Sequence, residues 1–548
     1  MTGLPPLSVF TWFMAFLPIL LVLVLMMAFR WSGGKAGAAA WIAAVIIAVT
    51  VFGADLRTVA MGTVKGLWTT VFVLYIIWGA MVLYQVVQVA GGFRVISDTF
   101  TRLTAGNREV QLLILGFAFP SFVQGVSGFG APIAIAAPLL AGIGFNPVIA
   151  AAAPLIGHAW AVTFGSLGSS YSVLITQTHA VDSPAAAHQV AVFAVIVIAL
   201  EGLLTPWVLI HMYGGFKAIR KNWLSILLMG VVASGTAVLV VTLATPFIGS
   251  FIAGLVAMAV GALVLPRLAS RHAGKQLPAA AAADPLPAGA ASGSRGFNTA
   301  FSGYYILILV VLGVYMTPLK AYLDQFLKAG LHTVDTATSF GFTVKGEQSY
   351  SSFRFLSSPG TLIFLSAIVA YLVYRIRGWW PKDGWKRVAQ GAFQQAIGAT
   401  VTVMSMSMMA VVMVQSGSTS LLAQGTARVT GGSYPLFAAL IGQLGAFMTG
   451  SNTNSNILFT LFQQDVAVLL GISVPIILGL QTAGGATATM ISPLNIALGT
   501  GSTGIVGREG EILNKTLWYC LLIGVLDGVL GWLMQYVFFK GYVWLLPR

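Results

Sequence analysis

Charged residues are scarce in this sequence. Only 8% of its 548 residues are Asp, Glu, Lys or Arg, and 57% are hydrophobic, whereas a soluble domain carries about 25% charged residues. The mean hydropathy of +0.90 excludes an ordinary soluble protein and indicates a polytopic membrane protein. The 28 basic residues exceed the 14 acidic ones. In a membrane protein such an excess sets orientation, so we expect the lipid bilayer and not nucleic acid as its partner.

Cysteine is almost absent as well. The one cysteine, Cys520, lies in an apolar run, which excludes an intramolecular disulfide and a cysteine metal cluster. The chain also lacks an HExxH zinc motif, a Walker loop and a dinucleotide fingerprint, so we expect no metal, no cofactor and no ATP-driven transport by this chain. No basic residue precedes the first apolar run, 9–29, and no small-residue cleavage site follows it, which favours a membrane span over a signal peptide.

Apolar runs long enough to cross a bilayer, which takes about 20 residues, recur along the chain. They cover 9–29, 36–54, 66–92, 189–210, 223–244, 245–265, 303–323, 359–376, 388–416 and 516–539. Clusters of Lys and Arg follow the runs that end at residues 29, 92, 210, 265 and 376. Because cytoplasmic loops are enriched in these residues, we expect these clusters inside the cell and both termini outside.

Two longer apolar regions, 111–178 and 434–506, are interrupted by Gly, Pro, Ser, Thr, Asn and Gln. The neighbouring basic clusters require one net crossing in each region, although each holds more apolar length than one helix uses. We therefore predict a re-entrant hairpin followed by a broken helix in each. The predicted hairpins cover about 111–144 and 434–470, and the broken helices about 148–178 and 474–506.

The two interrupted regions enter the membrane from opposite sides, so they form an inverted repeat, a common plan of secondary transporters. The first half would be 1–265 and the second 299–548. An Ala/Pro/Gly-rich cytoplasmic linker, 266–298, would join them. The predicted fold is an all-α polytopic membrane protein with about 12 transmembrane helices and two re-entrant hairpins.

Polar residues at the two hairpin tips point to function. Non-helical backbone inside a membrane occurs only where it lines a cavity or is buried in protein, and helix N-termini there suit a carboxylate. No Lys or Arg occurs from Glu109 to Phe216 or from Val429 to Gly507, so neutral donors must hold an anion, which favours a singly charged one. The candidate binding residues are Gln124, Ser127, Gly128, Phe129, Gly130, His158, Ser451, Asn452, Thr453, Asn454, Ser455 and Asn456. The alternative is that they only cap helix ends and pack against neighbours.

Four ionisable residues lie within apolar runs and are candidates for carrying a proton: His158, Glu201, Asp465 and Asp527. Ionisable groups at such places are functional hypotheses by default, and a carboxyl group away from water takes up a proton readily. Glu201 and Asp527 occupy corresponding places in the last helix of each repeat. Asp465 would alternatively be solvated at a hairpin mouth, and His158 would be a packing residue.

Four segments make the chain resemble the L-lactate permease family, which includes bacterial lactate and glycolate permeases. They are FPSFVQGVSGFGAPIAIAAPLL (119–140), PLIGHAWAVTFGSLGSS (154–170), GSNTNSNILF (450–459) and ISPLNIALG (491–499). The resemblance covers essentially the whole chain. It implies a transporter rather than an enzyme, which imports 2-hydroxymonocarboxylates (L-lactate, D-lactate, glycolate) with protons across the bacterial inner membrane.

The SNT sequence at Ser451–Thr453 is similar to the carboxylate-binding tip motif of dicarboxylate transporters in the wider ion-transporter group. Those relatives carry the motif in both hairpins, whereas the first hairpin here carries VSGFGAP. This difference argues against a symmetric site and against a sodium site made from both tips. Members of that group often form dimers and move a transport domain like an elevator, so a homodimer and an elevator mechanism are expected by analogy.

Other functions fit parts of the sequence. A sodium-coupled di- or tricarboxylate transporter on the same scaffold is the first alternative, although the lack of cations argues against a multivalent anion. An intramembrane serine protease would use the GxSG pattern at Gly125–Gly128 with His158 as base, but it leaves the second polar cluster unexplained. A passive channel is the third alternative, which a planar-bilayer recording separates from a carrier.

Overall fold

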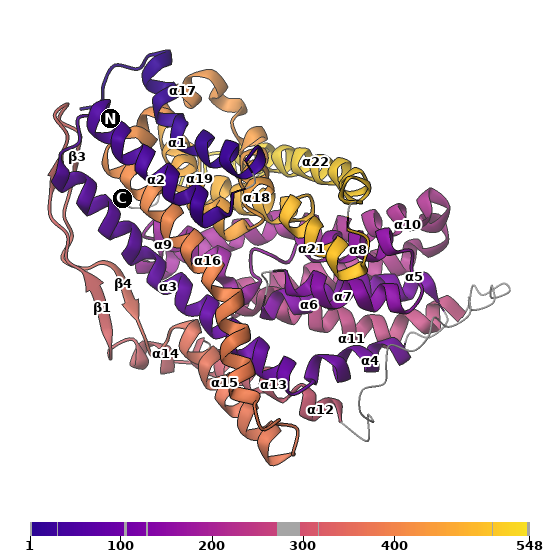
Figure 1. Cartoon of the computed structure of the whole chain (residues 1–548). Helices are drawn as coiled ribbons and strands as arrows, with labels where there is room; N and C mark the ends of the chain where they lie inside the picture. The colour runs from indigo at the N-terminus through magenta and orange to yellow at the C-terminus, as the bar shows by residue number, and fades with distance from the viewer. Residues whose placement is uncertain are drawn as a thin grey trace.

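The computed structural model describes residues 3–29, 31–103, 107–127, 130–270, 296–315, 317–506 and 508–544. Helices form most of this part of the chain, and ten of them are long and apolar enough to cross a membrane. The prediction of an all-α polytopic membrane protein is therefore confirmed (Figure 1). Residues 271–295 of the predicted linker lie outside the described residues.

The N-terminal part of the chain begins with four helices. They are α1 (Val9–Met27), α2 (Gly33–Thr50), α3 (Leu56–Val89) and α4 (Gly92–Leu103). The side chain of Ser8 caps α1 by accepting the backbone N–H of Thr11, and Asp55 caps α3 by accepting that of Thr58. Such caps satisfy N–H groups that have no partner within the helix.

The first interrupted region consists of short helices. They are α5 (Arg108–Gln111), the π-helix η1 (Leu112–Ala118), α6 (Phe119–Val126), α7 (Ala131–Gly142), α8 (Pro147–Ala159), η2 (Ser166–Gly168), α9 (Ser169–Gln177) and η3 (Ala180–Asp182). Gly130 begins α7 with a φ of 84°, a left-handed conformation that glycine adopts at little cost. Helix α6 is thereby separated from α7, which packs against it.

Two predicted spans, 189–210 and 223–244, lie in one helical element, α10 (Pro184–Leu243). Its backbone leaves the helical conformation at Gly214 and Gly215. The chain folds back there. A hydrogen bond of 2.8 Å from the Ser234 hydroxyl to the Ala199 carbonyl joins the two arms. Two antiparallel helices result, followed by η4 (Pro246–Ile248) and α11 (Gly249–Ser270).

The second half begins with three short helices and a loop that holds the strands. The helices are α12 (Phe297–Ala300), α13 (Ser302–Tyr315) and α14 (Leu319–Leu323). The strands are β1 (Lys328–Leu331), β2 (Thr336–Ala337), β3 (Thr343–Val344) and β4 (Tyr350–Arg354). Strands β1 and β4 pair antiparallel, as do β2 and β3. The run predicted to cross as 303–323 is not one helix. Helix α13 ends at Tyr315, and Pro318 stands at the N-cap of α14, since proline cannot continue a helix from the preceding turn.

The remaining helices include the second interrupted region. They are α15 (Pro359–Ile376), α16 (Gly384–Gln415), α17 (Ser418–Thr430), η5 (Gly431–Ser433), α18 (Pro435–Thr449), α19 (Asn452–Leu470), α20 (Val474–Thr487), η6 (Ala488–Met490), α21 (Pro493–Thr503), α22 (Glu509–Leu533) and η7 (Met534–Phe538).

Helices from the two halves of the sequence pack against each other. Helix α16 crosses α2 and α3 on one side of the molecule, and α6, α7, α8 and α11 lie on the other (Figure 1). The approach of α16 to α3 is close, since a Cβ atom at Gly66 would lie 2.7 Å from the Cα atom of Met408. Helices α18 to α22 pack between these groups and contact α8, α9 and α10.

Candidate functional site

The first broken helix is interrupted between α8 and α9. Every residue from 160 to 168 is buried, and the backbone φ angles of Ser166, Leu167 and Gly168 are positive at 47°, 52° and 77°. Positive φ is unfavourable for serine and leucine, so the surrounding structure must hold this conformation. The interruption begins earlier than the GSLGSS sequence at 165–170, where we expected it.

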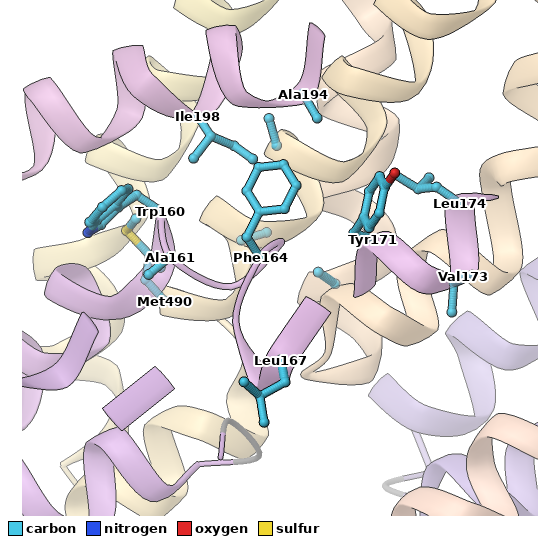
Figure 2. Close-up of a cluster of buried hydrophobic side chains, with 14 of the residues drawn as sticks. Trp160, Ala161, Phe164, Leu167, Tyr171, Val173, Leu174, Ala194, Ile198 and Met490 are labelled. Atoms are coloured by element: carbon cyan, nitrogen blue, oxygen red, sulfur yellow. The ribbon is translucent and has the colours of Figure 1, made fainter. Parts of the chain in front are cut away.

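Aromatic side chains fix this interrupted segment on both sides. Figure 2 shows Trp160, Phe164 and Tyr171 along it, facing the helix α10 that carries Ala194 and Ile198. The indole Nε1 of Trp160 donates to the Ser121 hydroxyl at 2.9 Å, and the Tyr171 hydroxyl donates to the Ala187 carbonyl at 2.8 Å. These bonds satisfy the polar ends of large buried rings, and the backbone between them keeps its irregular shape.

The second polar cluster lies at the N-terminus of α19. Gly450, with a φ of 72°, ends α18, and Ser451 caps α19 by accepting the N–H of Asn454 at 3.4 Å. The N-terminal turn of a helix carries a partial positive charge and unpaired N–H groups. The side chains of Asn452, Thr453 and Asn456 are buried in this turn or just after it.

Asparagine side chains of α19 join both broken helices. The amide nitrogen of Asn452 donates to the hydroxyls of Thr163 at 3.0 Å and Thr482 at 3.2 Å. That of Asn456 donates to the Thr482 hydroxyl at 2.9 Å and to the Ser170 carbonyl at 3.1 Å. Thr163 lies in the first interruption and Thr482 in α20, so segments from three parts of the sequence meet at one point.

The cluster contains acceptors that have no partner. The side-chain oxygens of Asn452, Asn454 and Asn456 are buried and make no hydrogen bond to the described residues. For Asn456 the orientation of the amide is fixed, because only its nitrogen can donate to the Ser170 carbonyl. An unpaired buried acceptor costs about 1–3 kcal/mol, so these oxygens mark a place where a hydroxyl donor would be stabilised.

The remaining residues of the predicted second cluster have structural partners. The hydroxyl of Ser455 donates to the Gly442 carbonyl at 2.8 Å and lies 3.1 Å from the Gln481 amide nitrogen, which donates to it. The hydroxyl of Thr453 lies 2.9 Å from that of Ser170.

The first hairpin tip lies beside the first interruption and does not share the hydrogen bonds of the asparagine cluster among the described residues. The hydroxyl of Ser127 donates to the carbonyl of Val123 in its own helix, and Gln124 lies beside Gly165. A Cβ atom at Gly130 would overlap with the side chain of Leu498 in α21. Among the described residues, no hydrogen bond joins Gln124 or Ser127 to residues 451–456. Gly128 and Phe129 lie outside the described residues.

Three side chains of the cluster were not among the predicted binding residues: Thr163, Ser170 and Thr482. Each belongs to a Gly- and Thr- or Ser-rich interruption that the sequence does show. Their convergence on α19 depends on tertiary packing, which periodicity and spacing do not reveal.

The candidate proton carriers have different surroundings. The ring Nδ1 of His158 lies 2.5 Å from the Pro154 carbonyl of the same helix, and Asp465, which is partly exposed, accepts from the Ser420 hydroxyl at 2.7 Å. Glu201 and Asp527 are 1% and 0% exposed, and their carboxyl groups lie close enough for their charges to interact. The structure therefore brings two of the four candidates together.

The space beside the cluster is small. A cavity of about 10 Å³ is lined by hydroxyl-bearing residues of α3 and α16, among them Thr69 and Ser407, and by Thr176, Gln177 and Ile457 of α9 and α19. It has room for roughly one water molecule. The cavity in this conformation is too small for an organic acid.

Comparison with known proteins identifies relatives over nearly the full length. A family model described as L-lactate permease matches residues 11–538. The glycolate permease of Escherichia coli K12 is 28% identical over 96% of this chain and 95% of its own. The L-lactate permease of Bacillus subtilis 168 is 29% identical over 94% of each chain. Among solved structures, the YdaH transporter of Alcanivorax borkumensis aligns over 89% of this chain and 88% of its own, with 15% identity and a TM-score of 0.45.

Proposed function

The chain belongs to the L-lactate permease family, and we propose that it imports L-lactate and related 2-hydroxymonocarboxylates, including D-lactate and glycolate, together with protons. The relatives named as L-lactate and glycolate permeases match over at least nine-tenths of both chains, which supports a substrate shared with them. A multi-pass transporter of this kind would lie in the bacterial inner membrane. The distribution of Lys and Arg favours both termini outside.

The observation that carries this proposal is the buried, cation-free cluster formed by Thr163, Ser170, Thr482 and the start of α19. Its hydroxyl groups and the N-terminal N–H groups of α19 suit the carboxylate of a small acid. The unpaired oxygens of Asn452, Asn454 and Asn456 suit the 2-hydroxyl group, which must donate a hydrogen bond. Because the segments that form it, within 109–216 and 429–507, contain no Lys or Arg, the cluster compensates one negative charge more easily than two or three.

In the transport cycle that we propose, the acid binds at this cluster and α19, α20 and the first broken helix move with it. A proton that enters with lactate makes the transported pair electrically neutral, which lowers the cost of crossing an apolar environment. The proton carriers would come from His158, Glu201, Asp465 and Asp527. An elevator movement within a homodimer is the expectation by analogy with the wider group.

One observation favours the second candidate, sodium-coupled transport of a di- or tricarboxylate. Unpaired amide oxygens of three asparagines near one helix N-terminus are ligands that a hard cation accepts. Replacing sodium with choline during uptake separates the two functions. Uptake that persists in choline and responds to a pH gradient supports proton coupling.

The test of the proposal is uptake of labelled L-lactate by proteoliposomes that contain the purified protein. With an inward proton gradient and no sodium, we expect accumulation above the equilibrium level. Collapse of the gradient by a protonophore should abolish accumulation. Uptake that is indifferent to the gradient would contradict proton coupling.

A further inference from the structure

Two buried carboxyl groups from opposite halves of the sequence meet beside α20. Glu201 lies on α10 and Asp527 on α22, and α20 packs against both helices. Their charges interact with each other and with the Cys520 thiol, which is also buried. The corresponding places of the two acids in the two repeats did not by themselves show that their carboxyl groups interact.

The pair lacks the partners that an ionised carboxylate needs. One oxygen of Glu201, Oε1, accepts a hydrogen bond of 2.5 Å from the Thr487 hydroxyl. The other oxygen of Glu201 and both oxygens of Asp527 are buried, and among the described residues they have no partner other than the carboxyl group of the other acid. No salt bridge of the described residues involves either acid. Burying one unpaired carboxylate already costs several kcal/mol, and two neighbouring carboxylates also repel each other.

The titratable groups around the pair do not supply a positive charge. Cys520 faces it from α22. Helix α8 also packs against α10 and α22, but its His158 binds the Pro154 carbonyl and does not contribute to the charge interactions of either acid. Helix α18 contributes the neutral Gln443, whose amide nitrogen donates to the Cys520 carbonyl at 2.7 Å. None of these groups offsets the negative charge of the two carboxylates, so bound protons must reduce that charge.

One helix connects this pair with the asparagine cluster. Thr487 at the end of α20 donates to Glu201, and Thr482 of the same helix accepts from Asn452 and Asn456. At 1.5 Å per residue the two threonines are about 7.5 Å apart along the axis. A shift of α20 on binding at Thr482 therefore changes the hydrogen bond that Thr487 makes to Glu201.

We propose that Glu201 and Asp527 form one proton-binding site that takes up and releases a single proton per cycle, and that Thr487 is the positioning residue that links it to the substrate site. This inference rests on the proposed function. In the step, one carboxylate oxygen of the pair forms an O–H bond with a proton from one side of the membrane. The same O–H bond breaks when the proton leaves to the other side of the membrane. No group is oxidised or reduced in this step. The two acids share the proton, as interacting carboxyl groups do when they cannot both ionise.

The test separates exchange from proton-driven accumulation in proteoliposomes. Counterflow measures exchange of labelled for unlabelled lactate at equal pH, and accumulation is measured with a pH gradient. With one proton per lactate, the wild type should accumulate lactate about tenfold per unit of pH gradient. We expect the double variant Glu201→Gln/Asp527→Asn to keep counterflow but to reach an inside-to-outside lactate ratio of only about one, because it has lost both carboxyl groups that could carry the proton. The control Glu109→Gln makes the same change at an acid paired with Lys221 and should accumulate like the wild type.

Thr487 variants test the link. Thr487→Val removes the hydroxyl and should reduce accumulation while counterflow persists, whereas Thr487→Ser keeps the donor and should restore accumulation. Loss of accumulation in both Thr487→Val and Thr487→Ser would contradict the positioning role.

Infrared spectroscopy tests the pair in the unmodified protein, so the inference does not depend on variant folding. We expect a protonated-carboxyl band near neutral pH that shifts in D₂O and changes when lactate binds. Absence of that band in the wild type, or wild-type accumulation by the double variant Glu201→Gln/Asp527→Asn, would overturn the inference. Absence of lactate counterflow in the wild type would instead contradict the proposed function.

Discussion

At the residue scale, the proposed substrate site consists of amides and hydroxyls that bond to one another, with the oxygens of Asn452, Asn454 and Asn456 left unpaired among the described residues. Thr482 receives hydrogen bonds from both Asn452 and Asn456, and Thr163 donates to the Thr482 carbonyl at 3.1 Å. Because these side chains are buried, each lost partner leaves a desolvated polar group unpaired. Conservative changes at this cluster should therefore alter substrate affinity.

Asn456→Asp tests this network at almost constant side-chain volume. The carboxylate cannot donate to the Ser170 carbonyl and adds a negative charge beside the proposed anion. We expect the apparent affinity for lactate to fall about tenfold to a hundredfold, which corresponds to about 1.4–2.8 kcal/mol.

The measurement for Asn456→Asp is the KM of lactate uptake. The matched control is Asn222→Asp at the fold-back of α10, where the amide donates only to Ala218 of its own helix. Unchanged KM in Asn456→Asp would place the acid elsewhere.

The sequence predicted some of the residues of the candidate binding cluster. The sequence SNTNSN already suggested a polar helix N-terminus, and Asn452, Thr453 and Asn456 do converge with both broken helices. Thr163 and Thr482 were not predictable as partners, because contacts between residues distant in the sequence leave no periodic signal. Ser127 was a candidate at the first hairpin tip, but its hydroxyl is satisfied by its own helix.

At the element scale, close helix packing holds the interrupted segments in place. Gly157 of α8 faces the π-helix η1, and a Cβ atom there would overlap with the carbonyl oxygen of Gly116. π-Helical turns are rare and often occur at functional sites. The packing of α8 against η1 thus positions the start of the first interruption.

Gly157→Ala should destabilise the protein by about 1–3 kcal/mol, because overpacking pushes two backbones apart. A thermal unfolding curve in detergent is the measurement. Gly235→Ala is the control, since a Cβ atom at Gly235 meets no neighbour within 4 Å. Equal melting temperatures for the two variants would show that α8 does not rest on η1.

The loop after α13 offers a pH-dependent test outside the membrane-spanning helices. Burial alone would raise the pKa of Asp324, but hydrogen bonds from Lys320 (2.6 Å) and Ser357 lower it below its ordinary value. The folded state therefore favours the ionised form. Stability from this group is present above the ordinary pKa of Asp, about 4, and is lost as the pH falls through the lowered pKa.

Asp324→Asn should accordingly lower the melting temperature at pH 7, and the difference from the wild type should shrink as the pH falls below about 4. Asp383→Asn is the control, because the Asp383 side chain makes no capping hydrogen bond. A pH-independent difference for Asp324→Asn would contradict this account.

Element boundaries show what hydropathy can and cannot predict. Glycine- and proline-rich stretches marked the interruptions, since these residues disfavour continuous helix. Hydropathy alone predicted one span over 303–323, which is longer than the helix there. Helix α13 ends at Tyr315, and Pro318 stands at the N-cap of α14. Hydropathy also could not show that Gly214 and Gly215 fold α10 back on itself.

At the scale of the whole molecule, the Lys and Arg clusters between the apolar runs predict an orientation in the membrane. The single cysteine is buried, so new surface cysteines are labelled against a nearly silent background. We expect Gln348→Cys in the strand-bearing loop to react with a membrane-impermeant maleimide added to intact cells. Lys382→Cys, between α15 and α16, should react only after the cells are opened. The reverse pattern would invert the predicted topology.

The most direct test of the central claim is a counterflow screen of small acids in proteoliposomes at equal and clamped pH. A buried cluster of hydroxyls and amides without Lys or Arg should exchange labelled L-lactate for lactate and glycolate. It should exchange poorly for propionate, which lacks the 2-hydroxyl group, and for the divalent succinate. Exchange with succinate as fast as with lactate, or no exchange with any 2-hydroxy acid, would contradict the account.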